Sequence, residues 1–296
     1  MKAATSFRHD GARAVTFLNY NQAELDRQYD QRVWAPDGAV AIRRYTEETD
    51  RVKKVLGEPK VFAYGPSPAE TLDLYPTKAA NAPIHVFIHG GAWRLLSKSD
   101  SGFAAEAFVN AGAHFIALDF ALLPAVTLPE MVAQVRRAIG WIYRHAHEFG
   151  GDPARIHVSG HSSGGHLAGC VAVTDWTALD LPADTVKSTI CASGMYDLLP
   201  VRLSARNEYV KLTLETEHAL SPMRHLDKIS GPVFVAYGSG ESDEFKRQSR
   251  SFAAALGGCL AAAPVEYEGF NHYEVVLTLA DPSARLGRTA LDLMGL

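Results

Sequence analysis

The sequence predicts an α/β fold in which helices flank a doubly wound, mostly parallel sheet. Short apolar runs alternate with helical patterns along the chain, and no repeat, linker or low-complexity tract interrupts them. Two of the apolar runs lead directly into glycine-rich segments, at 89–93 and 160–164. Sheets of this kind bind ligands at the carboxyl ends of their strands. We therefore expect one domain over 1–296, with both glycine-rich segments at the same edge of its sheet.

The composition is typical of a globular protein, because 47% of the 296 residues are hydrophobic and 21% are charged. The net charge of −4 gives no support to a nucleic-acid or membrane partner, and no apolar run reaches the ~18 residues of a membrane span. The first ten residues lack the apolar core of a secretory signal. Cys170, Cys191 and Cys259 lack metal-ligand spacing. These features predict a cytoplasmic protein with free thiols. The sequence leaves the oligomeric state open, with a homodimer as one alternative.

The chain begins with an expected helical segment of about 18–56. Apolar residues recur at four-residue spacing from Leu25, which predicts a short amphipathic helix, and a second helix is expected over 46–56. If this segment lies over the mouth of the site, Tyr29 and Trp34 are candidates for substrate binding. A helix that braces the back of the sheet is the alternative.

The remaining elements follow from apolar runs and helical periodicity. Strands are expected over 60–64, 70–75, 84–88, 113–119, 156–159, 188–193, 233–237 and 263–267, with the first two antiparallel. Helices are expected over 101–111, 129–149, after Ser162, over 201–217, over 242–256 and at the end of the chain. The stretch of about 197–230 is the expected position of a lid or substrate-pocket excursion.

The segment Gly160-His161-Ser162-Ser163-Gly164 lies between a β-branched run and a small-residue helical pattern. In this strand–turn–helix context, Gly-x-Ser-x-Gly is typical of the nucleophile elbow of α/β-hydrolases. The two glycines keep bulk away from the close crossing of strand and helix, and the turn holds its serine in a strained conformation. Ser162 is therefore the predicted nucleophile.

A second glycine-rich segment, His89-Gly90-Gly91-Ala92-Trp93, directly follows the strand expected over 84–88. A strand that ends in His-Gly-Gly predicts the loop that supplies oxyanion-hole amides. We assign these amides to Gly91 and Ala92, joined by that of Ser163. His89 is interpreted as a brace for the loop rather than a base, and Asp119 at the next strand end as structural rather than a triad acid.

A serine nucleophile needs a general base and an acid that orients the base. His272 follows the last expected strand in a Gly-Phe-Asn-His turn, whereas His218 and His225 have polar surroundings. The acid should follow the penultimate strand, where the spacing leaves Glu241 and Asp243 equally open. The reaction expected from this set is transfer of an acyl group to water, with no metal or organic cofactor.

The segment around His89 fits the His-Gly-Gly-x-Trp motif of the arylformamidase (kynurenine formamidase) branch of α/β-hydrolases, which the chain resembles from about 25 to 279. Other stretches that resemble this branch are Met131-Val132-Ala133-Gln134-Val135, Gly160-His161-Ser162, 168–176, Ser193-Gly194-Met195-Tyr196-Asp197-Leu198, Glu244-Phe245-Lys246-Arg247-Gln248-Ser249 and His272-Tyr273-Glu274-Val275-Val276. The resemblance implies hydrolysis of a small aryl amide such as N-formylkynurenine, with aryl esters also accepted. The branch has its catalytic aspartate three residues before the Glu-Phe pair, so the resemblance favours Glu241 over Asp243.

The chain departs from this branch at Glu241, which replaces aspartate, and at Ala92, where an aromatic residue is common. The small Ala92 side chain predicts a wider acyl pocket, so an N-acylanthranilate-type amidase or a short-chain aryl carboxylesterase is the alternative function. A non-catalytic binding protein on the same fold is a more remote alternative. Trp93 and Arg94 are candidate substrate-binding residues. Arg94 and Lys98 are also candidates to meet a substrate carboxylate, with solvated surface charge as the alternative.

Overall fold

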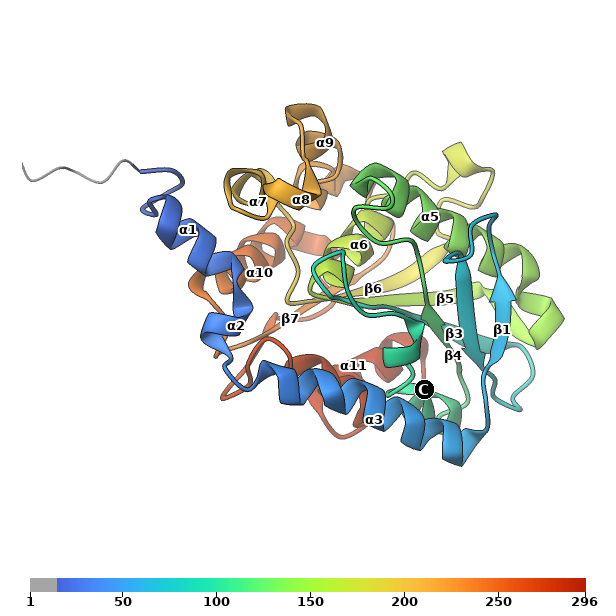
Figure 1. Ribbon diagram of the computed structural model, residues 1–296. Coiled ribbons are helices and arrows are strands. Elements are labelled where there is room, and N and C mark those ends of the chain that lie inside the picture. The colour runs from blue at the N-terminus through green and yellow to red at the C-terminus, as the bar shows by residue number, and fades with distance from the viewer. Residues whose placement is uncertain (1–14) are drawn as a thin grey trace, which may run out of the picture.

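The computed structural model describes residues 15–296, so the expectation about a secretory signal in the first ten residues lies outside the described part. The described strands form one eight-stranded sheet in the order β1-β2-β4-β3-β5-β6-β7-β8 (Figure 1). The strands are β1 Lys60–Ala63, β2 Thr71–Tyr75, β3 Ala82–Ile88, β4 His114–Leu118, β5 Gly151–His161, β6 Val186–Ala192, β7 Val233–Gly238 and β8 Val265–Tyr267.

Most of this sheet is parallel. β1 pairs antiparallel with β2, and β2 pairs antiparallel with β4. Every other pairing, from β4 through β3 to β8, is parallel. The predicted doubly wound, mostly parallel α/β sheet is therefore confirmed, together with the antiparallel pair at its beginning. The carboxyl ends of β3 and β5 to β8 lie at one edge, where such sheets place their ligands.

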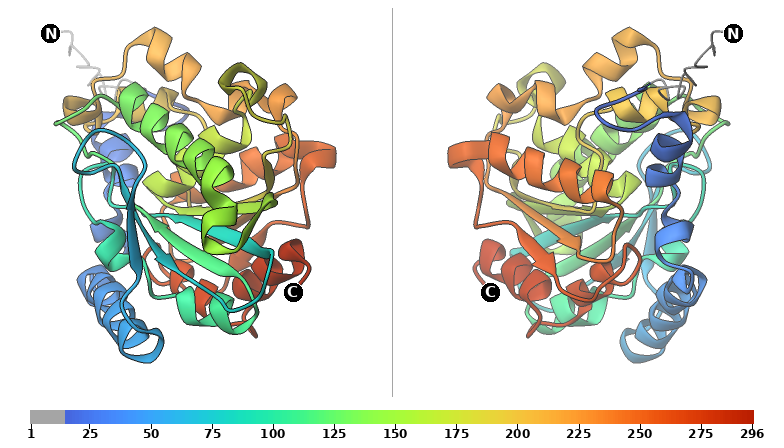
Figure 2. Two further views of the ribbon diagram at one scale, coloured as in Figure 1. Left: turned by 90° about the vertical axis from the view of Figure 1, so that its right-hand side faces the viewer. Right: turned by 90° about the vertical axis from the view of Figure 1, so that its left-hand side faces the viewer.

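Helices cover both faces of the sheet (Figure 2). The longer helices are α3 Gly38–Leu56, α5 Leu128–His145, α6 Ser163–Ala172, α10 Asp243–Leu256 and α11 Arg285–Met294, and the shorter ones are α1 Gln22–Tyr29, α2 Gln31–Trp34, α4 Ala105–Asn110, α7 Leu199–Leu203, α8 Asn207–Val210 and α9 Leu214–Ala219. α5, α6 and α10 bury apolar side chains in one core cluster, and α3, α4 and α11 contribute to a second one. Both faces of the central strands are therefore buried, which explains their nearly continuous apolar runs.

Short helices of the 3-10 type complete the connections. They span Lys98–Asp100, Ala146–Phe149, Thr177–Leu179, Pro222–Arg224, Leu226–Lys228, Gly257–Cys259 and Val275–Ala280. Within residues 15–296, no helix combines the length and the apolar content needed to cross a bilayer.

The N-terminal segment divides into two parts with different positions. The Asn21 side chain and Glu24 form a capping box at the start of α1, and α1 lies against α7 and α10 beside the carboxyl edge of the sheet (Figure 1). α3 begins at Gly38, earlier than the helix expected over 46–56, and it packs beside α4 on the other face. The first part therefore borders the predicted site, and the second part braces the sheet.

Two helix predictions are corrected by the structure. The continuous helix expected over 201–217 is instead the three short helices α7, α8 and α9. Lys211 adopts a left-handed conformation with φ 58°, and Thr213 caps the start of α9 with its side chain, so the helical hydrogen bonds are interrupted there. The helix expected over 101–111 is shorter, because α4 begins only at Ala105.

Candidate active site

Ser162 lies in the sharp turn between β5 and α6. Its backbone has φ 58° and ψ −120°, a conformation that is costly for a residue with a side chain. A Cβ atom on Gly160 would lie 2.0 Å from the Gly164 carbonyl oxygen, and one on Gly164 would lie 2.1 Å from that of Ile88. Only glycine fits at these two positions, and the close crossing holds the strained serine in place. This is the strand–turn–helix geometry of a nucleophile elbow.

Ser162, His272 and Glu241 form a continuous chain of hydrogen bonds. The Ser162 Oγ atom is 2.8 Å from His272 Nε2, and His272 Nδ1 is 2.9 Å from Glu241 Oε2. The three side chains come from the segments that follow β5, β8 and β7, and all three are buried. In this arrangement Nδ1 donates its hydrogen to the carboxylate, which leaves Nε2 free to accept the hydroxyl proton of Ser162.

The second carboxylate oxygen of Glu241 is also held. Glu241 Oε1 accepts hydrogen bonds from the Ser193 hydroxyl and from the Gly238 backbone amide, each at 2.6 Å. Asp243, the alternative acid, is the first residue of α10, and its side chain is 68% exposed. The structure therefore brings Glu241 to His272 and leaves Asp243 at the surface beside Lys246.

Two further residues hold His272, and the sequence analysis did not identify either of them. His161 Nε2 lies 2.7 Å from the backbone carbonyl oxygen of His272 and donates to it. Burial lowers the pKa of His161 to about 3, so its ring is neutral near pH 7 and fixed by this bond. The Phe245 ring packs edge-on against the His272 ring, with 4.8 Å between the centroids. The sequence signals were that His161 immediately precedes Ser162 and that Phe245 belongs to the Glu-Phe pair used for the family resemblance.

The loop after β3 lies directly beside Ser162. A Cβ atom on Gly90 would be 3.2 Å from the Ser162 Cβ, and Gly91 has φ 99°. Within residues 15–296, the backbone amides of Gly91 and Ala92 donate no hydrogen bond, whereas the Trp93 amide donates to Ser163 Oγ. Free amides next to a serine can stabilise negative charge on a carbonyl oxygen.

His89 braces this loop. Its ring stacks on Phe120 with 4.4 Å between centroids, Nδ1 lies 2.9 Å from the Gly90 carbonyl oxygen, and Nε2 is 3.6 Å from Asp119. Neither His89 nor Asp119 belongs to the hydrogen-bonded chain of Ser162. His218 and His225 pack against each other on the excursion, and they do not belong to it either.

Of the residues expected to contact substrate, two are buried aromatic residues and three are held by other side chains. Tyr29 is buried between Phe245 and Glu244, and Trp93 is buried beside His166. Trp34 lies under Arg27, Arg94 stacks on Tyr209 of α8, and Lys98 is bound to Asp73 at 2.5 Å. Of these residues, Arg94 connects the loop after β3 directly to the excursion.

Buried imidazoles are common in β3, β5 and α6. Burial lowers the pKa of His85 to about 3 and that of His157 and His166 to about 4. Hydroxyl or carbonyl groups hold each ring, such as Ser159 beside His85. In the described part of the chain, no three His, Cys, Asp or Glu side chains are arranged to hold a metal ion.

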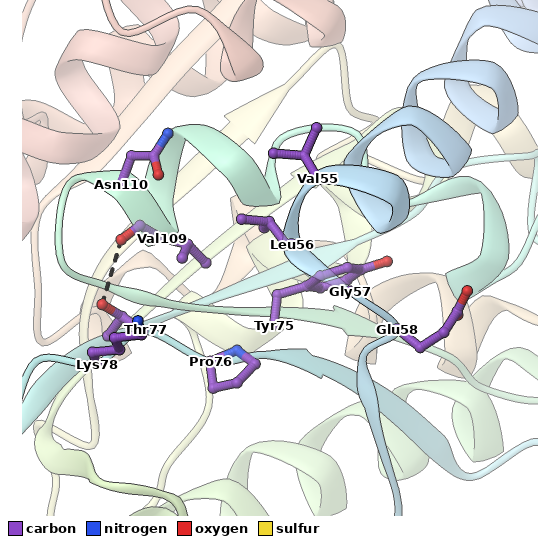
Figure 3. Close-up of a pocket in the computed structure, with 10 residues that line it drawn as sticks. All are labelled: Val55, Leu56, Gly57, Glu58, Tyr75, Pro76, Thr77, Lys78, Val109 and Asn110. Atoms are coloured by element: carbon purple, nitrogen blue, oxygen red, sulfur yellow. Dashed lines mark hydrogen bonds between the residues drawn. The ribbon is translucent and has the colours of Figure 1, made fainter.

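A pocket of about 470 Å³ lies elsewhere on the surface (Figure 3). It is lined by the ends of α3, β2 and α4, and by Pro76 to Lys78. Tyr75 in its wall pairs with Phe115 near the start of β4, so this pocket is at the opposite edge of the sheet from Ser162. None of the lining side chains is a serine, cysteine or histidine, and the hydrolytic groups lie outside it.

The similarity to known proteins extends over most of this chain. Residues 72–256 match the family model described as BD-FAE. The kynurenine formamidase of Danio rerio is 32% identical over 289 residues, which cover 92% of this chain and 96% of that protein. Esterase LipQ of Mycobacterium tuberculosis is 26% identical, with 86% of this chain and 63% of that protein covered.

A Pyrobaculum calidifontis esterase has a similar fold. It superposes with a TM-score of 0.67 at 18% identity, with 90% of this chain and 97% of that chain covered. Because the similarity to the Danio rerio protein extends over nearly the full length of both chains, this chain belongs to the kynurenine formamidase family of α/β-hydrolases and is a hydrolase of amides or esters.

Proposed function

We propose that this hydrolase removes the formyl or another acyl group from an aryl amine, with N-formylkynurenine as its leading substrate, through an acyl-enzyme on Ser162. The observation that carries the proposal is the 2.8 Å contact between Ser162 Oγ and His272 Nε2, directly beside two free backbone amides. The similarity to a kynurenine formamidase supports the choice of an N-formyl anilide.

In the first half of the reaction, Ser162 Oγ attacks the carbonyl carbon of the substrate while His272 Nε2 takes the hydroxyl proton. Glu241 holds Nδ1–H, so the ring keeps the tautomer and orientation that proton transfer needs. The carbonyl oxygen becomes negatively charged and is stabilised by the amides of Gly91, Ala92 and Ser163. The amide of Ser163 is the first in α6, so the positive end of that helix points to the same oxygen.

In the second half, the charged His272 ring gives its proton to the leaving nitrogen, the carbon–nitrogen bond breaks, and the aryl amine departs. The formyl group then remains as an ester on Ser162. A water molecule, deprotonated by His272 Nε2, attacks this ester, and the proton returns to Ser162 Oγ as the carboxylic acid is released. Each step uses only water and groups of this chain.

Aryl ester or N-acylanthranilate hydrolysis is the second candidate function. Two observations favour it: Ala92 places only a methyl group beside the free amides, and the esterase LipQ of Mycobacterium tuberculosis is a relative. A small side chain at this position leaves room for acyl groups larger than formyl.

One kinetic comparison tests these candidates. The kcat/KM value is measured for N-formylkynurenine, N-acetylanthranilate, longer N-acylanthranilates and p-nitrophenyl acetate, with wild type and Ser162→Ala. We expect the formyl substrate to be preferred and every activity to fall by about 10⁴-fold or more in Ser162→Ala. Slow deformylation beside fast cleavage of a longer acyl anilide would replace the leading substrate by the second candidate. Activity that survives in Ser162→Ala would contradict the whole mechanism.

A further inference from the structure

Arg206 lies between α7 and α8, and its guanidinium group is partly buried. Nε and Nη2 both donate to the backbone carbonyl oxygen of Tyr29, at 3.1 and 2.6 Å. Nη1 meets only the Met195 sulfur at 3.5 Å, and sulfur is a weak acceptor. A buried or partly buried cation is usually paired with an anion, because removing a charge from water is costly.

The acidic groups around Arg206 already have other partners. Asp30 is bound by both Arg32 Nε and Nη2, at 2.8 and 2.9 Å. Glu244 accepts two bonds from Arg247, each at 2.7 Å. Within residues 15–296, no carboxylate forms an ion pair with Arg206. Asp30 is near enough to interact electrostatically with Arg206, but its hydrogen bonds go to Arg32.

The Phe245 ring separates the Arg206 guanidinium from the catalytic His272. The Arg206 guanidinium lies 5.7 Å from the Phe245 ring centroid, and the same Phe245 ring packs against His272. α8 begins directly after Arg206, and its Tyr209 lies under Arg94 from the oxyanion loop, with 4.3 Å from the guanidinium to the ring centroid. The segment that carries Arg206 therefore contacts Phe245, which packs against the catalytic histidine, and Arg94 of the oxyanion loop.

We propose that Arg206 is a specificity-determining residue that binds a carboxylate on the leaving-group side of the substrate. Guanidinium groups present a planar fork of N–H donors that matches a carboxylate, and the bond to the Met195 sulfur is weak enough to be exchanged for it. The substrate class is then an acyl anilide whose aryl amine bears an acidic substituent. This inference rests on the proposed function and narrows its substrate class.

The wild-type enzyme supplies the first test, which needs no variant. The kcat/KM value of N-formylkynurenine is compared with that of its carboxamide, in which the carboxylate is replaced by a neutral group of the same shape. We expect the acid to be favoured by about 10- to 100-fold, the range for a hydrogen bond to a charged group. Equal kcat/KM values for N-formylkynurenine and its carboxamide (the two formanilides) would overturn the inference and leave the proposed function intact. Hydrolysis of p-nitrophenyl acetate but of neither formanilide would overturn the proposed function itself.

The second test uses Arg206→Gln and Arg206→Lys. In Arg206→Gln we expect the preference for the acid over the carboxamide to disappear, because kcat/KM falls more for the acid than for the carboxamide. Arg206→Lys should restore part of the preference, because it keeps the charge but not the fork. If Arg206 only anchors α1 through Tyr29, both formanilides will slow equally in Arg206→Gln, and the inference is wrong.

Arg94→Gln is the matched control, because Arg94 is a second cation that contacts α8. We expect this variant to keep the preference for the acid over the carboxamide. Loss of the preference in Arg94→Gln, with retention in Arg206→Gln, would assign the carboxylate to Arg94 and overturn the proposal.

Discussion

The segments that follow β3, β5, β7 and β8 pack backbone against backbone, whereas the short helices beside them are held by side chains, both apolar and polar. We call the first region the catalytic floor; it comprises 89–95, 160–164, 238–242 and 270–273. We call the second region the cap; it comprises α1, α2, α7, α8 and α9. The two regions are neighbours in space, yet they depend on different kinds of contact.

In the floor, glycines allow backbones to approach so closely that no side chain would fit. A Cβ atom on Gly164 would lie 2.1 Å from the Ile88 carbonyl oxygen, and one on Gly238 would lie 2.3 Å from that of Phe270. The Gly240 amide also donates to the Phe270 carbonyl oxygen at 2.9 Å. Since these contacts involve backbone atoms, the distances among Ser162, His272 and Glu241 follow from the strand ends themselves.

In the cap, side chains form the connecting bonds. Gln22 Nε2 donates to the Leu203 carbonyl oxygen at 2.9 Å, and Asp26 accepts from the Ala205 amide at 2.6 Å. The Tyr29 hydroxyl lies 3.0 Å from Glu244 of α10, and burial raises its pKa well above the ordinary value. Such contacts can change by single substitutions without disturbing the strand ends. We therefore propose that the floor determines the reaction and that the cap determines which substrate is accepted.

The largest expected effect comes from the acid of the floor. Glu241→Gln should lower kcat/KM for p-nitrophenyl acetate by about 10³- to 10⁴-fold, because an amide no longer stabilises the charged ring or selects its tautomer. Asp243→Asn, two residues away but exposed, should stay within about twofold of wild type. A larger loss in Asp243→Asn than in Glu241→Gln would reassign the acid.

Gly164→Ala tests the close packing of the floor. The added methyl group would collide with the carbonyl oxygens of Ile88 and His89, and backbone atoms cannot move aside as a flexible side chain can. We expect the free energy of unfolding in urea to fall by about 3 kcal/mol. Gly258→Ala is the control, since a Cβ atom there would meet nothing within 4 Å. Similar losses of unfolding free energy in Gly164→Ala and Gly258→Ala would show that the close backbone packing at the elbow does not determine stability.

The buried histidines predict a stability that depends on pH. The pKa values of His85 and His161 are lowered to about 3, and those of His157 and His166 to about 4. Below about pH 6.5 the unfolded chain binds protons at these sites and the folded protein does not, so stability is full above pH 6.5 and declines as the pH falls toward 4. Each of these histidines changes the free energy of unfolding by at most about 1.4 kcal/mol per pH unit.

Urea denaturation at pH 7.5, 6 and 5 measures this slope. His157→Gln should make it shallower, whereas His218→Gln in the cap, where the ring is exposed, should leave it unchanged. A slope that is the same in all three proteins would show that burial of His157 does not contribute to acid instability.

The smallest effect is expected in the cap. Asp26→Ala removes the acceptor for the Ala205 amide and should cost about 1 kcal/mol or less of stability. With N-formylkynurenine, KM should rise by about fivefold or less while kcat stays near the wild-type value, because the floor is not changed. Asp37→Ala is the control, since Asp37 makes no side-chain bond at the start of α3. A fall in kcat as large as that in Glu241→Gln would contradict the division between floor and cap.

The fold class and the local motifs could be predicted from the sequence because each depends on neighbouring residues. An apolar run marks a strand that is buried on both faces, and the Gly-x-Ser-x-Gly spacing marks a crossing that only glycine permits. The secondary structure of the excursion, the stretch of about 197–230, was predicted less well. Its residues have helical periodicity over 201–217, but local caps at Ser204 and Thr213 and the left-handed Lys211 divide it into three helices.

The tertiary structure alone decided how side chains distant in the sequence meet. Spacing left Glu241 and Asp243 open, and the family resemblance favoured Glu241. The position where α10 begins then directs the Glu241 carboxylate to His272 and the Asp243 carboxylate to solvent. The bond from His161 to His272 and the position of Arg206 beside Phe245 join segments that are far apart in the chain. Sequence periodicity predicts which face of a helix or strand is buried, but it does not predict which other element covers that face.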